Sequence, residues 1–130
     1  MQSMQYITAL YAGICGLLLV AFAVRVSLTR GQQKVDLGDG GKDPMLRAIR
    51  VHGNAAEYVP ITLFLMLLLE MQGSHHWFLH VAGITLIVSR LLHAQGLMQS
   101  RMLTPGRLVG TGLGWTLIGV LSIDCFFGFV

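Results

Sequence analysis

Four long apolar stretches, separated by polar connections, are the feature that most limits what this chain can fold into. The first runs from Tyr6 to Leu28 and contains one charged residue, Arg25, near its end. About 20 apolar residues are enough for a helix to cross the hydrocarbon core of a bilayer. The stretches predict transmembrane helices at about 6–29, 44–71, 75–97 and 105–129, within one domain spanning 1–130. The predicted fold class is an all-α membrane protein, a four-transmembrane-helix bundle.

The composition agrees with this class. Hydrophobic residues make up 54% and charged residues 12% of the chain, whereas about 25% charged residues is usual in soluble proteins. The charge density is too low for a nucleic-acid-binding surface, so no nucleic-acid partner is expected. Cys15 and Cys125 have no metal-ligand spacing, so no metal site is expected. No Lys or Arg precedes the first stretch, so we expect it to be retained as a helix rather than removed as a signal peptide.

The positions of the basic residues predict the topology. All nine lie around the first and third connections: Arg25, Arg30, Lys34, Lys42, Arg47, Arg50, Arg90, Arg101 and Arg107. Basic residues gather on the cytoplasmic side of membrane proteins. The first and third connections are therefore predicted to be cytoplasmic, with both termini on the opposite side.

A polar stripe is predicted at the start of the second helix, where Asp43 and Pro44 provide a helix start. At 100° per residue, five polar residues fall within an arc of about 100°: Arg47, Arg50, Asn54, Glu57 and Tyr58. His52 points to nearly the opposite side. In the last helix, Gly106, Gly110 and Gly114 have the spacing that allows close helix packing in lipid.

Two interpretations of this stripe are open. Polar side chains are costly in lipid, so the stripe is expected to face the bundle interior or a wet cavity. It could be a network that pins the helices together. Alternatively, its arginines could bind carboxylates, Glu57 an ammonium and Asn54 an amide. That set suits a small, anionic, peptide-like zwitterion arriving from the cytoplasm.

The pattern RxxRxxxNxxEYxP, which begins at Arg47 and ends at Pro60, resembles the MAPEG superfamily of membrane-associated proteins in eicosanoid and glutathione metabolism. The resemblance extends over nearly the whole chain. It implies a homotrimer in the lipid bilayer, with the co-substrate glutathione bound between neighbouring subunits. It also implies that Arg50, Asn54, Glu57 and Tyr58 contact glutathione, while His52 and Arg30 serve the neighbouring subunit's site.

The third helix and the third connection supply further candidates. In the segment Ser89–Gly96, Arg90 matches a family arginine. His93 is either an acid–base group at the site or a packing hydrogen bond. The family activates the thiol with an arginine before the fourth helix. Arg101 and Arg107 are the candidates here, and Arg101 is preferred as the catalytic residue.

The resemblance implies a glutathione-dependent enzyme in a bacterial inner membrane. It would conjugate glutathione to lipophilic electrophiles or reduce lipid hydroperoxides through an arginine-stabilised thiolate. Two alternatives stay open: a non-catalytic lipid-binding scaffold on the same fold, and a small four-helix exporter that uses Glu57 as its proton-coupled carboxylate.

Overall fold

The computed structural model describes residues 6–99 and 103–128. In these ranges the chain forms four α-helices: α1 (Ile7–Gln33), α2 (Asp43–Met71), α3 (His76–Met98) and α4 (Pro105–Phe127). Each is long and apolar enough to cross a membrane. The predicted class, an all-α four-helix membrane bundle, is confirmed.

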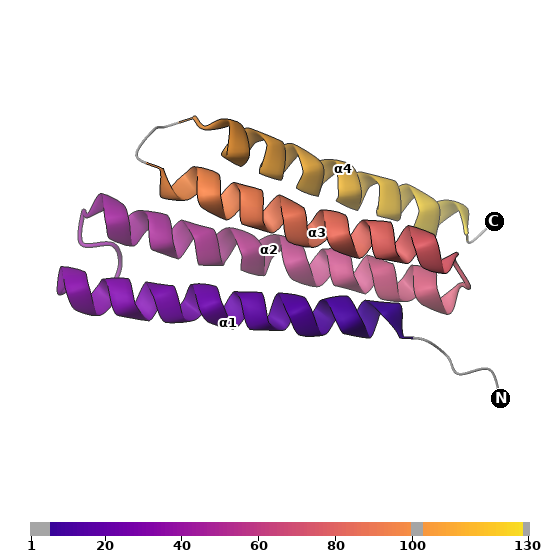
Figure 1. Cartoon of the computed structure of the whole chain (residues 1–130), viewed down its shortest axis with the longest axis horizontal. Coiled ribbons are helices and arrows are strands. Elements are labelled where there is room, and N and C mark those ends of the chain that lie inside the picture. Colours follow the sequence, from indigo (N-terminus) through magenta and orange to yellow (C-terminus); the bar gives the residue numbers. More distant parts are fainter. Residues whose placement is uncertain (1–5, 100–102, 129–130) are drawn as a thin grey trace.

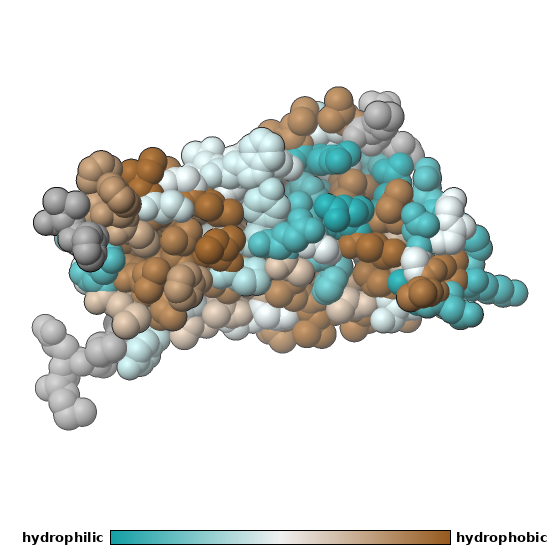
Figure 2. Space-filling view, turned by 180° about the vertical axis from the view of Figure 1, so that it is seen from behind, coloured by the Kyte–Doolittle hydropathy of each residue, from teal (hydrophilic) through white to brown (hydrophobic). Residues whose placement is uncertain are grey.

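The helices run alternately up and down, so the α2–α3 turn lies at the same end as the start of α1 and the end of α4 (Figure 1). We call this the turn end, and the end with the two longer connections the loop end. Packing contacts join α2 to each of the other helices, and among the described residues α1 does not touch α4. Figure 2 shows hydrophilic residues gathered toward the loop end and reaching to mid-length, whereas the turn end is mostly hydrophobic.

The first helix is longer than its apolar stretch. It was predicted to end at about residue 29, but it continues to Gln33 and stops at Lys34, which has a left-handed φ of 53°. In the last turn of this helix, the guanidinium of Arg30 donates to the carbonyls of Val35 (3.3 Å) and Gly38 (3.0 Å) in the first loop. The change from apolar to polar sequence therefore marks where the helix leaves the lipid rather than where it ends.

At the turn end, the carboxylate of Glu70 from α2 caps the start of α1. Glu70 accepts hydrogen bonds from the backbone amides of Ile7 and of Thr8, the latter at 3.1 Å. These are two of the amides that a helix N-terminus leaves without an internal partner. The negative charge also lies at the positive end of the helix dipole. Glu70 therefore joins the first two helices although its side chain is polar.

The glycine series in α4 faces α3. A Cβ atom added at Gly110 would lie 2.5 Å from the backbone nitrogen of His93 and 2.6 Å from the carbonyl oxygen of Ser89. At Gly106 it would lie 3.0 Å from the carbonyl oxygen of Leu92. At Gly114 it would collide with the guanidinium of Arg90. The glycines therefore bring the α4 backbone against α3 and leave room for one large buried cation.

The apolar core is divided along the bundle. The larger cluster includes Tyr11, Met66, Leu79 and Leu121, all buried. The smaller cluster, beside the polar stripe, is formed by Phe22, Val51, Ala55 and Ala94. This cluster is smaller than the first, and polar side chains of α2, α3 and α4 come together in the same half of the bundle.

Candidate functional site

Arg50 and Glu57 form an ion pair on the outer side of α2. Their side chains approach to 3.6 Å and are 52% and 57% exposed. They lie about two turns apart, so both project from one side of the helix, as the predicted stripe requires. In the single chain this pair borders open space instead of the bundle core.

Behind this pair, Arg90 from α3 is 2% exposed and connects three helices. Its guanidinium donates to Asn54 Oδ1 on α2 and, at 3.2 Å, to the carbonyl of Gly110 on α4. A third bond, from Nε to Ser89 Oγ, measures 3.2 Å. The guanidinium carbon also lies 4.7 Å from the centre of the Tyr58 ring, within cation–π range. Arg90 therefore fixes the positions of Asn54 and Tyr58.

Tyr58 is held on its other side by α4. The indole Nε1 of Trp115 donates to the Tyr58 hydroxyl at 2.7 Å. Trp115 is 63% exposed, so most of its ring faces the surroundings. Because the hydroxyl oxygen accepts this bond, its own hydrogen is available to a ligand.

These residues border a cavity of about 230 Å³ between three helices. Its lining comes from α2 (Arg50, Asn54 and Tyr58), α3 (His93 and Leu97) and α4 (Arg107, Thr111 and Trp115). Two guanidiniums, of Arg50 and Arg107, line it, and that of Arg90 contacts its lining residues Asn54 and Tyr58. This excess of positive charge favours an anionic ligand. Ligand pockets usually enclose about 300–1,000 Å³, so this cavity is smaller than most of them.

Arg107 enters the cavity because of how α4 begins. Thr104 caps this helix: its buried Oγ1 accepts from the Arg107 amide at 3.3 Å and donates to the carbonyl of Gly96 at 2.8 Å. Thr104 thus ties the start of α4 to the end of α3 beside the cavity. The preferred catalytic candidate, Arg101, lies outside the described residues.

Three predicted site residues lie apart from this cavity. Arg47 donates to the carbonyls of Leu97 (3.1 Å) and Gln99 and lies 3.9 Å from Asp43. It therefore binds the carbonyl end of α3. Arg30 binds the first loop, and His52 is not among the residues that line the cavity.

Sequence reasoning missed three lining or positioning residues: Thr104, Thr111 and Trp115. The Thr104-Pro105 pair was a readable signal, because threonine is a common helix cap and proline a common first helical residue. Thr111 and Trp115 gave no such signal. Trp115 is exposed beside Tyr58.

Comparisons with known proteins agree with this architecture. The model of the MAPEG family matches residues 8–127. The chain is also similar to the inner membrane protein YecN of Escherichia coli strain K12, with 47% identity over 90 residues that make up 69% of each chain. The same protein from Escherichia coli O6:H1 strain CFT073 matches to the same extent.

Proposed function

Because the chain belongs to the MAPEG family, we propose that it is a glutathione-dependent enzyme of a bacterial inner membrane. It would transfer glutathione to lipophilic electrophiles or use it to reduce lipid hydroperoxides. The observation that carries the proposal is the cavity shared by Arg50, Asn54, Tyr58 and Arg107. The inner-membrane location follows from the similarity to YecN.

The polar groups of the cavity complement those of glutathione, which has two carboxylates, one ammonium and two amides. Arg50 can bind a carboxylate through two parallel hydrogen bonds, and Glu57 can accept from the ammonium. The Asn54 oxygen is taken by Arg90, which leaves its NH₂ group to donate. The Tyr58 hydroxyl can donate as well. Asn54 and Tyr58 are therefore left as donors, because their oxygens already accept bonds inside the protein.

A neighbouring subunit would complete the site. Arg50 and Glu57 are half exposed in the single chain, although charged side chains are costly where they face lipid. A homotrimer would cover them, and Arg30 and His52 of the adjacent copy are our candidates for the remaining contacts. The exposed ring of Trp115 would then border the opening through which a lipophilic substrate enters from the bilayer.

We assign activation of the thiol to Arg107, because it lines the cavity. An adjacent arginine lowers the pKa of a thiol from about 8.5 and increases the thiolate fraction. In the transferase reaction the sulfur forms a bond to an electrophilic carbon, and the leaving group takes the displaced electron pair. Holding a water-soluble thiol at the bilayer edge brings it to a membrane-dissolved partner.

Calorimetry on the purified protein in detergent tests glutathione binding. We expect the wild-type chain to bind, and Arg50→Ala to weaken binding by about tenfold or more, as expected for loss of a charge-assisted hydrogen-bond pair. Arg25→Ala is the matched control, because Arg25 is an exposed arginine outside this cavity. Absence of binding at millimolar glutathione would sink the proposal.

Turnover of chlorodinitrobenzene separates an enzyme from a lipid-binding scaffold. The scaffold hypothesis predicts no conjugation at any glutathione concentration. For an enzyme, Arg107→Ala should shift the pH profile of kcat/KM upward, toward the ordinary thiol pKa of about 8.5, and Arg101→Ala should leave it unchanged. The reverse result would assign thiol activation to Arg101 and leave the glutathione site intact.

A further inference from the structure

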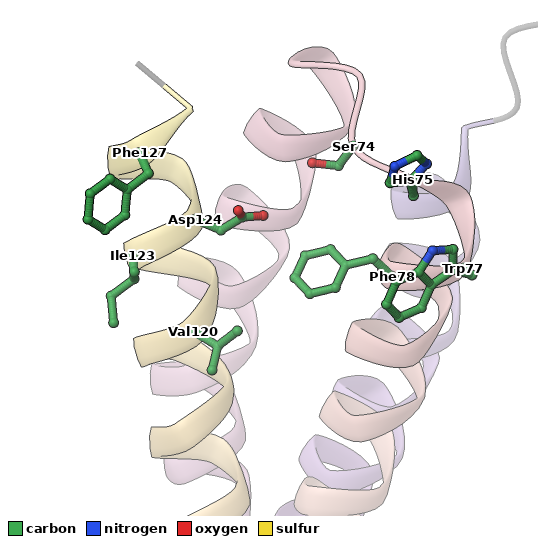
Figure 3. Close-up of a pocket in the computed structure, with 8 residues that line it drawn as sticks. All are labelled: Ser74, His75, Trp77, Phe78, Val120, Ile123, Asp124 and Phe127. Carbon is green, nitrogen blue, oxygen red and sulfur yellow. The ribbon is translucent and has the colours of Figure 1, made fainter. Parts of the chain in front are cut away.

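A larger cavity lies at the turn end, away from the candidate glutathione site. It has a volume of about 490 Å³ and lies between the start of α3 and the end of α4 (Figure 3). Its wall is mostly apolar, from Trp77, Phe78, Val120, Ile123 and Phe127. A cavity of this size with an apolar wall and a few polar groups is typical of sites for small organic ligands.

The packing of α4 explains why the cavity opens at this end. Gly106, Gly110 and Gly114 hold the first half of α4 against α3. Farther along, the buried positions of α4 are Leu117 and Leu121, whose side chains keep the two helices apart. The cavity occupies the space between the separated helix ends.

One acidic group enters this apolar space. Figure 3 shows the Asp124 carboxylate and the Phe78 ring pointing toward one another across the gap between α4 and α3. Among the described residues, no side chain forms a hydrogen bond or ion pair with the Asp124 carboxylate. The sequence has no Lys or Arg between Arg50 and Arg90 and none after Arg107. Lysine and arginine are thus absent from this end of the sequence, and the ionisable base in the lining of the cavity is His75.

The dipole of α4 strengthens the attraction between this carboxylate and a cation. Asp124 is in the last turn of α4, where the negative end of the helix dipole disfavours an acid and favours a positive charge. Glu70, the other acid of this end, is engaged at the start of α1. A cation in the cavity would therefore relieve an unfavourable local arrangement.

We propose that this cavity binds a lipophilic cation: an ammonium or phosphonium carried on a hydrocarbon or aromatic body. The positive charge lies against Asp124 and the ring faces of Phe78 and Trp77, which attract cations. The hydrocarbon body packs on Val120, Ile123 and Phe127. This chemistry has two sources, the amine headgroup of a membrane lipid and a foreign amphiphilic cation. The inference does not depend on the proposed glutathione chemistry.

Equilibrium dialysis of tetraphenylphosphonium against the protein in uncharged maltoside micelles tests the proposal. We expect saturable binding that Asp124→Asn weakens by about two- to fivefold, the effect of removing one exposed ion pair. The uncharged analogue triphenylphosphine oxide should bind both proteins equally. Phe78→Ala should weaken the binding of both compounds. Asp36→Asn, which removes an acid from the first loop, is the control.

The thermal midpoint of Asp124→Asn in the same micelles, compared with that of the wild type, serves as the check that the variant is folded. Lipid nanodiscs then distinguish the two sources. The quantity to compare is the difference in tetraphenylphosphonium affinity between wild type and Asp124→Asn. If this difference is smaller in phosphatidylethanolamine than in phosphatidylglycerol, a lipid amine occupies the cavity. If it is the same in both lipids, the ligand is a foreign cation. Equal affinity of the two proteins would overturn the proposal. If the wild type does not bind tetraphenylphosphonium, the proposal is overturned too. This includes the case in which another copy of the chain covers the cavity.

Discussion

Arg90 is 2% exposed and donates hydrogen bonds to side chains or carbonyls of α2, α3 and α4. Lysine at this position would keep the charge but lose the planar group that donates in several directions. We expect Arg90→Lys to reduce the free energy of unfolding by about 2–3 kcal/mol, since buried acceptors are left without partners. Glutathione affinity should fall as well, because Asn54 and Tyr58 lose their support.

Detergent-titration unfolding in mixed micelles and calorimetry measure these two effects. Arg25→Lys is the control, because Arg25 has no hydrogen bond or ion pair with any described residue. Unchanged stability and affinity in Arg90→Lys would show that the network around Arg90 does not hold the site together.

At the level of residues, periodicity was enough to place Arg50, Asn54, Glu57 and Tyr58 on one side of a helix. It could not show that Arg47, on the same side, would bind the carbonyl end of α3. Angular position depends on the helix alone, whereas the partner of a long side chain depends on which element packs beside it. The sequence likewise could not show that Arg107 lines the cavity, because Thr104 and the start of α4 set its position. The preference for Arg101 over Arg107 stays an untested prediction.

Among the elements, α4 packs against its neighbour α3 through a series of glycines. A Cβ at Gly110 would press on the backbone of α3, which cannot move aside as a flexible side chain can. We expect Gly110→Ala to destabilise the bundle by about 1–3 kcal/mol, as for other overpacked interiors. The thermal midpoint in detergent should fall accordingly, and the cavity beside His93 should bind glutathione less well.

Gly112 offers a matched control in the same helix. A Cβ there would meet nothing within 4 Å, and alanine has the higher helix propensity. Gly112→Ala should therefore be neutral or slightly stabilising. Equal destabilisation by both substitutions would mean that α4 does not pack closely on α3 through Gly110.

The start of α1 depends on one carboxylate of α2. Glu70→Ala removes both hydrogen bonds to the amides of Ile7 and Thr8. We expect a loss of about 0.5–2 kcal/mol, the usual cost of removing a helix cap. Hydrogen exchange should accelerate at the first turn of α1 and stay unchanged near Gln33. Uniform acceleration along α1 would instead indicate that Glu70 holds the whole helix in the bundle.

The lengths of the elements show what hydropathy can predict. The apolar stretches were enough to predict four helices, because each one must cross the same thickness of lipid. They were not enough to predict where α1 ends, because the helix continues through Arg30 and the polar residues after it. Helix ends outside the bilayer depend on caps and loop contacts, and the contact between Arg30 and Gly38 is fixed only after folding.

For the molecule as a whole, the two ends have different chemical character. The loop end carries the basic residues and the proposed anionic co-substrate, and the turn end carries Asp124 and the proposed cation site. The positive-inside rule predicts that the proposed glutathione site opens toward the cytoplasm, because the basic connections lie at the same end. The half-exposed Arg50–Glu57 pair is the strongest reason to expect that the active form contains more than one copy.

Mixed assemblies test whether neighbouring copies share a site. If Arg50 acts from one subunit and Arg30 from the next, Arg30→Ala and Arg50→Ala should each abolish activity alone. Co-expressed in equal amounts, they should restore about a quarter of the sites, because a site is intact where an Arg30→Ala copy supplies Arg50 and an Arg50→Ala copy supplies Arg30. Arg50→Ala mixed with Glu57→Ala is the control and should restore none, since both residues act from one chain. With mixed assembly verified by two affinity tags, absence of recovery in the Arg30 and Arg50 pair would confine the site to a single subunit.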